Sequence, residues 1–389
     1  MNPEQEEEAH GQIIELLISR DIGLVEEALV SRDHDNIQGA LERLAAFIRQ
    51  MPPEDRLRSL QPRLGGTVAR ILREPWPRND VHEAAFSIIL AALRMTITER
   101  EDPGNLPLFT YLVDELGILD IIKTKITPPF PNGDNVAVRA LVPLTNFTLV
   151  PEVAPAVCAS GIVPHLIQLA RTRVCEFPAV YSLIALANIA IHPVSHSCLL
   201  DSGAIPLATE LLSLLQTNET DFYRLDCGLS ASFIICRLVG THEQGSGAAA
   251  IHENRVLLDR LHWLLTLVLK AGPEGRVIGS SWNPANIVMD IATLAKSDRN
   301  KPKLSPFVEL IVSVWTAYPT NKRLVHFAVK ALHQMMFDES CRSRIIEFSL
   351  FGDLSLLLMS IKSESTVDLQ TMQLAEVILH QLPSRTKPS

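Results

Sequence analysis

The stretch SGIVPHLIQL, residues 160–169, returns as SGAIPLATEL at residues 202–211, so the second copy begins 42 residues after the first. A second landmark, LTNFT at residues 144–148, returns as LANIA at residues 186–190 with the same offset. Two separate landmarks that share one period indicate an internal repeat. A repeat of this length is typical of solenoids, in which one structural unit is stacked on the next.

Each copy has the sequence pattern of consecutive helices. Gly161 and Gly203 each end one helix, and Pro164 and Pro206 lie in the first turn of the next, where a missing N–H costs nothing. A helix of about three turns follows, then a polar loop and a longer helix with Ala and Leu at three- and four-residue spacing. The pattern predicts helical units that bury their apolar faces on one another.

Composition agrees with an ordered helical chain. Of the 389 residues, 47% are hydrophobic and only 5% are aromatic, which favours helices packed through Leu, Ile, Val and Ala. The formal net charge of −9 disfavours a general nucleic-acid surface, although a local basic patch remains compatible with it. A solenoid also explains a chain that is long for one compact core.

The scattered cysteines indicate a reducing compartment, and the N-terminal residues and apolar runs resemble neither a secretory signal nor a membrane span. The six cysteines are scattered without paired spacing, as expected of reduced thiols in the cytoplasm or nucleus. The first eight residues, MNPEQEEE, are acidic and do not resemble a secretory signal. Apolar runs such as residues 263–269 are far shorter than a membrane span, which needs about 20 residues. We expect a soluble cytoplasmic or nuclear monomer.

The segment from Ser160 to Leu212 resembles the armadillo repeat, in which a short helix led by Gly is followed by two longer helices. The resemblance implies an all-α, right-handed superhelical α-solenoid of about eight armadillo-type repeats. We expect an acidic N-terminal segment with the start of the first helix at 1–21, the solenoid at 22–383, and a short flexible tail at 384–389. The expected copies are 22–59, 60–115, 116–159, 160–201, 202–252, 253–303, 304–347 and 348–383.

The resemblance also implies a binding groove. In armadillo proteins the third helices line a concave face, where a recurring Asn binds the main chain of an extended peptide with its amide donor and acceptor. Asn146 and Asn188 match this position directly. The remaining candidate groove residues, at equivalent positions of later copies or one to two turns earlier, are Arg237, Asp290, Gln334, Arg139, Tyr181 and Phe233. An interhelical hydrogen bond is the alternative role for the two Asn residues.

One departure from the family pattern bears on a specific function. Family members that import basic signals have a Trp four residues before the recurring Asn. The corresponding residues here are Val142, Ile184 and Phe233, which argues against a nuclear-import adaptor.

Three kinds of motif in the sequence were considered as metal-binding, phosphate-binding or catalytic sites, and each match is incomplete. His192, His196 and Cys198 have ligand-like spacing, but no second ligand pair lies nearby, so we expect no metal. The sequence GSG at residues 245–247 lacks the Gly-Lys-Ser/Thr of a phosphate loop and reads as a linker. No nucleophile motif or oxyanion loop is present, and the chain is therefore expected to be neither an enzyme nor a cofactor protein.

Two further features are candidate contact sites. Irregular stretches at residues 217–221, 241–247 and 271–283 interrupt the period, and such insertions are either tolerated surface loops or partner-binding loops. An aromatic and basic cluster is either a patch for an acidic segment or packing beside a solvated loop; it comprises Trp315, Tyr318, Lys322, Arg323 and His326.

These observations predict a non-catalytic scaffold or adaptor that binds an extended or helical segment of a protein partner in its groove. A few aromatic or Arg anchors would supply most of the binding energy. The alternatives are a small-GTPase regulator of the exchange or chaperone type and, less favoured, a transport adaptor or an enzyme-associated subunit. We expect no nucleic-acid partner and no membrane span.

Overall fold

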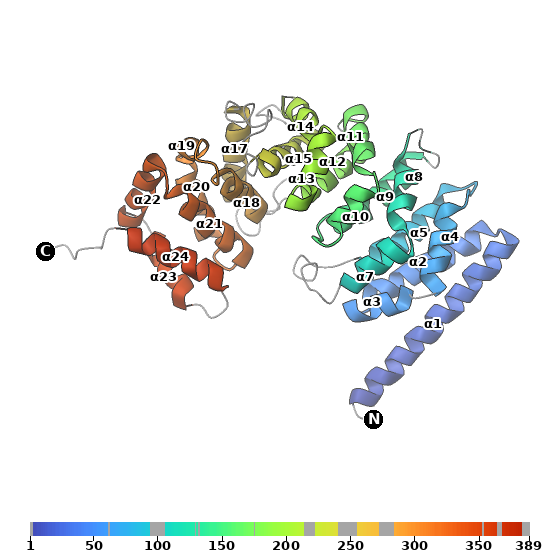
Figure 1. Ribbon diagram of the computed structural model, residues 1–389. Coiled ribbons are helices and arrows are strands. Elements are labelled where there is room, and N and C mark those ends of the chain that lie inside the picture. Colours follow the sequence, from blue (N-terminus) through green and yellow to red (C-terminus); the bar gives the residue numbers. More distant parts are fainter. Residues whose placement is uncertain are drawn as a thin grey trace. The chain divides into compact units, whose positions relative to one another are not determined.

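A computed structural model describes residues 3–60, 63–93, 106–128, 130, 133–174, 176–213, 222–239, 255–271, 284–351, 354–363 and 368–382. Every regular element in these ranges is a helix, as the sequence predicted. The chain divides into two compact units, Met1–Ser202 and Gly203–Ser389, and each is described by itself (Figure 1).

The first unit runs from the longest helix to the short helices that end the fourth repeat (Figure 1). Its elements are α1 (Pro3–Ser31), α2 (His34–Gln50), α3 (Pro53–Leu60), α4 (Arg63–Arg73), α5 (Asn79–Ala92), α7 (Leu106–Thr110), the π-helical turn η2 (Tyr111–Glu115), α8 (Ile118–Ile126), α9 (Gly133–Phe147), α10 (Ala154–Ala159), α11 (Val163–Thr172), α12 (Phe177–Ile189), the 3₁₀ turn η3 (Pro193–Ser195) and α13 (His196–Asp201).

The second unit continues the same helical pattern to the last described turn. Its elements are α14 (Ala204–Ser213), α15 (Phe222–Val239), α17 (Arg255–Ala271), α18 (Pro284–Leu294), α19 (Lys301–Leu304), α20 (Phe307–Ala317), α21 (Lys322–Met335), α22 (Glu339–Phe351), α23 (Leu354–Ser363) and α24 (Leu369–Gln381).

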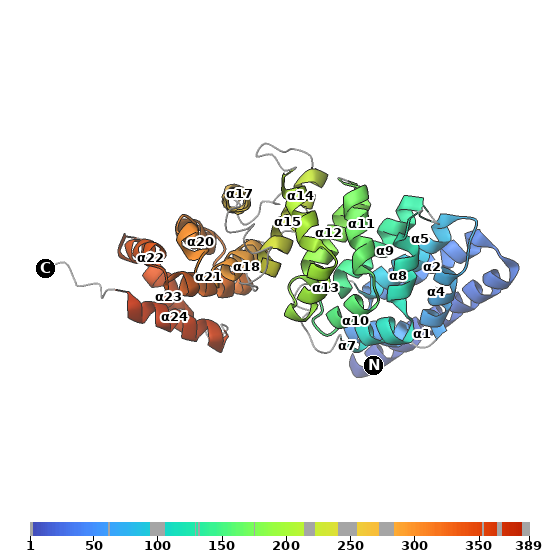
Figure 2. The same ribbon diagram turned by 45° about the horizontal axis from the view of Figure 1, so that its top comes forward.

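In each unit one row of helices packs side by side in chain order, and we call the members of this row the ladder helices. In the first unit α2 packs on α5, α5 on α9 and α9 on α12; in the second α15 packs on α18, α18 on α21 and α21 on α24 (Figure 2). Each of the eight sequence intervals expected to be a repeat contains one ladder helix. A second layer, which includes α11 on α12 and α14 on α15, packs against each row.

The glycines and prolines of the repeat have the conformations that the sequence pattern requires. Gly161 and Gly203 adopt φ of 70° and 85°, the left-handed region that only glycine enters without strain. Pro164 lies in the first turn of α11, where its missing N–H breaks no hydrogen bond. One side of α11 is then buried through Val163, Leu166, Ile167, Leu169 and Ala170. Chain reversal and burial therefore follow from the same short motif.

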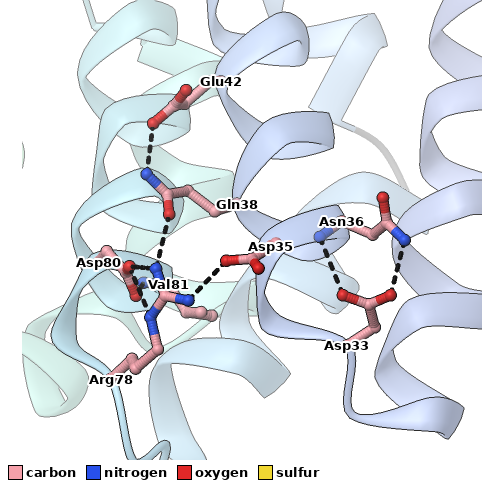
Figure 3. A network of polar contacts seen from close by, with 8 residues as sticks. All are labelled: Asp33, Asp35, Asn36, Gln38, Glu42, Arg78, Asp80 and Val81. Carbon is pink, nitrogen blue, oxygen red and sulfur yellow. Dashed lines mark hydrogen bonds and ion pairs between the residues drawn. The ribbon is translucent and has the colours of Figure 1, made fainter.

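Polar contacts supplement apolar packing between the first ladder helices. Arg78, just before α5, forms ion pairs with Asp35 on α2 and with Asp80, and it donates a hydrogen bond to Gln38 (Figure 3). Asp33 caps α2 by accepting the N–H of Asn36 at 3.2 Å (Figure 3). The guanidinium therefore links the beginnings of two neighbouring ladder helices.

Candidate functional site

The face of α9 and α12 carries the candidate residues of the first unit. Arg139 and Asn146 lie seven residues apart on α9, and Tyr181 and Asn188 have the same spacing on α12. Seven residues are about two helical turns, so each pair lies on one side of its helix. Arg139 is exposed and the other three are partly exposed. We call these four residues the first-unit face.

Asn188 connects two repeats. Its Nδ2 donates to the carbonyl oxygen of Thr145 at 3.0 Å, near the C-terminal end of α9. The last carbonyls of a helix have no partner within the helix. Among the described residues, the carbonyl oxygen of Thr145 accepts hydrogen bonds from two side chains, Asn188 and Thr148 Oγ1 at 3.1 Å. One amide hydrogen of Asn188 is thus used inside the fold, and the side chain remains partly exposed.

Asn146 differs from Asn188 although it occupies the equivalent position one repeat earlier. Its side chain makes no hydrogen bond with any residue that the structure describes. The amide is partly exposed and can offer two donors and an acceptor to a main chain lying on α9. Of the four residues of this face, Asn146 is therefore the one whose side chain interacts least with the rest of the described structure.

An aromatic pair extends the face along α12. The rings of Tyr181 and Phe177 stack with centroids 6.5 Å apart and planes inclined by 15°, and Phe177 is 51% exposed. On α9, Arg139 Nε lies 4.0 Å from Glu83 Oε2, a loose contact that leaves the guanidinium half exposed. The sequence analysis did not single out Phe177, although its spacing of one turn from Tyr181 would have revealed it.

In the second unit three of the candidates are buried. Arg237 Nε donates to Asp290 Oδ1 at 2.8 Å and Nη2 to Oδ2 at 3.3 Å, and the guanidinium lies 5.0 Å from the ring centroid of Phe233. Asp290 and Phe233 are fully buried, and Arg237 is 4% exposed. Burial raises the pKa of Asp290 to about 6, although Arg237 opposes this shift. These side chains join α15 to α18 and have no surface to offer a ligand.

The remaining candidates are divided between surface and core. Gln334 is partly exposed on α21, and its side chain makes no hydrogen bond with any described residue. Within the aromatic and basic cluster, Trp315 is buried, and Tyr318 donates to the carbonyl of Val268 at 3.1 Å. His326 is 2.6 Å from Thr371 Oγ1, in a contact between α21 and α24. Packing accounts for these three residues.

The two histidines of the candidate metal motif make structural hydrogen bonds. His192 Nε2 lies 3.0 Å from the carbonyl oxygen of Thr148, and His196 Nε2 lies 2.9 Å from that of Ala190. Both rings are buried. Across the described ranges, no group of three or more His, Cys, Asp or Glu is placed to hold a metal ion.

Several sequence predictions lie outside the described residues. These are the irregular stretches at 217–221 and 241–247, the part of the third stretch at 272–283, and the tail at 384–389. Of the described helices, none is by itself long and apolar enough to cross a membrane. Residues Phe177–Ile189 and Pro193–Asp201 reach that length and composition only together, across a bend of 114°.

Comparison with known proteins identifies the fold. No protein-family model and no curated protein matches the sequence. The structure of SYS-1 matches 96% of this chain at 13% identity with a TM-score of 0.58. A β-catenin structure, from work on the interaction between cadherin and β-catenin, matches 95% at 12% identity with a TM-score of 0.53.

This chain has an armadillo-repeat fold. It spans 64% of the SYS-1 chain and 60% of the β-catenin chain, less than two thirds of each. A computationally designed armadillo repeat protein for modular peptide recognition matches 64% of this chain at 15% identity, with a lower TM-score of 0.46. The structural similarity to SYS-1 and β-catenin establishes the armadillo architecture. At 13% and 12% sequence identity it does not establish the function, which is argued from the residues below.

Proposed function

We propose that this armadillo protein is a non-catalytic scaffold that binds an extended or helical segment of a partner protein on the first-unit face. The observation that carries the proposal is the partly exposed amide of Asn146, which makes no hydrogen bond with any described side chain or main chain. The partly exposed amide on α9 provides main-chain recognition, and the aromatic pair on the neighbouring helix α12, with its exposed Phe177 ring, provides an apolar anchor.

Each residue of the face has a distinct part in the proposed complex. Asn146 pairs with an N–H and a C=O of the bound segment, because its amide carries both an acceptor oxygen and an NH₂ donor. Tyr181 and Phe177 cover an apolar side chain of the partner, and Arg139 exchanges its loose contact with Glu83 for a carboxylate. Asn188 keeps its hydrogen bond to Thr145 and positions α12 beside α9.

The fold and the cysteines support the same proposal in a coarser way. The β-catenin structure that shares the armadillo fold comes from work on a protein–protein interaction, that of cadherin with β-catenin. The six cysteines are scattered along the sequence without paired spacing, and on this ground we extend the proposal to protein binding inside the cell.

The test uses a photoreactive amino acid incorporated at position 139 in the full chain. A matched control carries the same amino acid at Gln168, an exposed position on α11 in the other layer. We expect position 139 to crosslink one stretch of a partner from cell extract and position 168 to crosslink none of it. A synthetic peptide of that stretch should bind the Asn146→Ala/Tyr181→Ala variant at least about tenfold more weakly, a loss of 1.4 kcal/mol or more.

Two outcomes would reject the proposal. One is crosslinking of the same partner stretch from both positions, which would mean non-specific contact. The other is an unchanged peptide affinity in the Asn146→Ala/Tyr181→Ala variant when its melting temperature equals that of the wild type. Gln168→Ala is the matched control for the affinity measurement, because it removes an exposed amide from the second layer.

A further inference from the structure

Helix α4 of the first unit exposes only one strip of its surface, and arginines dominate that strip. The exposed residues are Arg63, Gly66, Arg70 and Arg73, and we call them the arginine strip. Every other residue of this 11-residue helix is buried. The spacing of three, four and three residues places the members of the strip on one side of the helix. Their relative positions therefore follow from the geometry of α4 itself.

The fold uses only part of the hydrogen-bonding capacity of these arginines. Arg63 forms an ion pair with Glu26 on α1, with Nε 3.0 Å from Oε1. Arg73 Nη2 donates to the carbonyl oxygen of Leu116 at 2.6 Å, which occupies one of the five N–H groups of its guanidinium. Arg70 adds its charge to the larger effect of Arg63 in lowering the pKa of Glu26, but it forms no hydrogen bond or ion pair with a described residue. Arg70 and Arg73, one turn apart, can therefore bind an external carboxylate.

Gly66 lies between the arginines at a position where the described fold does not require a glycine. A Cβ at Gly66 would meet nothing within 4 Å, whereas a Cβ at the preceding Gly65 would contact Tyr111 Oη. Glycine in a helix interior is less stable than alanine, so Gly66 weakens α4 without improving its packing. The missing side chain leaves room for the backbone of a second helix to approach the strip closely.

The spacing of the arginines fits a helix better than an extended peptide. At a rise of 1.5 Å per residue, Arg70 lies about 10 Å along the axis from Arg63, and Arg73 about 4.5 Å further. Carboxylates at the same sequence intervals on a second helix along α4 come opposite all three guanidinium groups. Residues on one side of a strand recur about every 6.6 Å, which matches neither interval.

Carboxylates on neighbouring helices narrow the positive surface. Helices α1 and α8 both pack on α4, and they carry the exposed residues Glu27 and Asp120. The whole chain has a net charge of −9. A nucleic acid or an anionic membrane presents phosphates over a broad surface and would also meet these carboxylates. An acidic helix can confine its charges to the strip.

We propose that the arginine strip is a second binding site, which takes an acidic helix of a partner protein. Arg70 and Arg73 bind carboxylates of that helix through their planar guanidinium groups, and Gly66 admits its backbone. Arg63, already paired with Glu26, adds positive charge at the other end of the strip. Helix α4 packs on the ladder helix α5 and carries no residue of the first-unit face, so this site goes beyond the proposed function.

Fluorescence anisotropy of the full chain with helical peptides tests the strip. The probes are two labelled alanine-based peptides of about 18 residues, long enough to be helical, with three Glu at the spacing of the arginines in forward or reverse order. We expect at least one of them to bind, and matched peptides with Gln to bind at least about tenfold more weakly. Arg70→Gln/Arg73→Gln should weaken the Glu peptide at least about tenfold. The control Arg49→Gln/Arg299→Gln removes two exposed arginines elsewhere and should change affinity less than about twofold.

Two further changes separate the shape of the strip from its charge. Gly66→Leu keeps every arginine but blocks the close approach, so it should weaken the Glu peptide at least about tenfold. Its melting temperature should equal or exceed that of the wild type, because Leu favours a helix more than Gly does. A Glu peptide with a central Pro should also bind at least about tenfold more weakly, because Pro breaks its helix.

Several results would overturn this proposal. They are equal losses in the two double arginine variants, an unchanged affinity in Gly66→Leu, a Pro peptide that binds as tightly as its parent, and tighter binding of a single-stranded RNA decamer. Melting temperatures establish that each variant is folded, and Arg70→Gln, which removes no hydrogen bond to a described residue, repeats the charge test if the double variant is unstable. Asn146→Ala/Tyr181→Ala should leave these affinities unchanged, so that a failure here and a failure of the first-unit face are read out separately.

Discussion

Arg237 on α15 and Asp290 on α18 form a two-point ion pair inside the second unit, with Nε–Oδ1 at 2.8 Å and Nη2–Oδ2 at 3.3 Å. Both residues are buried, so each charge depends on the other for its solvation. The cost of desolvating two charges offsets much of their attraction. We therefore expect the pair to specify how α15 and α18 meet more than it adds to the free energy of unfolding.

Removing one charge of this pair should be far more harmful than removing both. We expect Asp290→Asn to lower the free energy of unfolding by about 3–5 kcal/mol, because it leaves Arg237 buried without a counter-ion. The double variant Arg237→Met/Asp290→Leu should recover most of that loss. Urea unfolding at pH 7.5, above the Asp290 pKa of about 6, measures both. A double variant no more stable than Asp290→Asn would show that the pair is a net source of stability.

Alanine substitution of Asn188 and of Asn146 should have different effects on the free energy of unfolding. Asn188→Ala removes the hydrogen bond to Thr145, so we expect a loss of about 1 kcal/mol in the free energy of unfolding. Asn146→Ala removes no hydrogen bond to a described residue and should leave stability within about 0.5 kcal/mol of the wild type. Thermal and urea unfolding of the two variants check this. Equal losses would mean that Asn146 also supports the fold.

The repeat predicted the fold because its signals are local. The conformation of Gly161 and Gly203, the position of Pro164 and the apolar face of α11 each depend on a few adjacent residues. The 42-residue period relates the two central copies, and each of the eight expected copies, although unequal in length, contains one ladder helix. These signals determine helices and their order, which is why an all-α armadillo solenoid could be predicted without a matching family model.

The candidate site was less predictable because the burial of a side chain depends on residues that are far away in the sequence. Arg237 and Asp290 are polar residues at ladder positions, and sequence alone favours a surface location for such residues. Their burial requires the packing of α15 on α18, across 53 residues of chain.

Adjacent glycines in α4 should respond oppositely to alanine. A Cβ at Gly65 would contact Tyr111 Oη and would lie 3.1 Å from both the Leu60 carbonyl oxygen and Leu116 Cδ1, whereas a Cβ at Gly66 would meet nothing within 4 Å. We expect Gly65→Ala to lower the free energy of unfolding by about 1–3 kcal/mol through overpacking. Gly66→Ala should raise it by up to about 1 kcal/mol through helix propensity. Urea unfolding measures both, and a neutral Gly65→Ala would show that Tyr111 moves aside freely.

A buried histidine and lysine lie between α5 and α8. His82 Nε2 is 3.1 Å from Lys125 Nζ and 3.0 Å from the carbonyl oxygen of Glu74. Burial is the main cause that lowers the pKa of His82 to about 4, and the charge of Lys125 adds to it. Burial likewise lowers the pKa of Lys125 to about 8. Both groups bind a proton less readily in the folded chain than in the unfolded chain.

This pair should make stability depend on pH in two windows. Between pH 6.5 and about 4 the unfolded chain binds a proton at His82 that the folded chain does not, so stability falls as the pH falls. The full loss from this group is about 3 kcal/mol. Between about pH 8 and 10.5 folded Lys125 is deprotonated while unfolded Lys125 is not, so stability rises with pH. Urea unfolding across both windows measures the two slopes.

Two variants assign these slopes to their residues. Lys125→Met removes the alkaline rise and raises the folded-state pKa of His82, so the acid loss should still begin near pH 6.5 but become smaller and level off at a higher pH. His82→Gln should remove the acid loss attributed to this residue and identify the His82 signal among the twelve histidines in an NMR titration. A wild-type His82 that titrates near 6.5 in the folded protein would mean that α5 and α8 do not enclose it. The NMR titration thus tests the packing of these two helices directly.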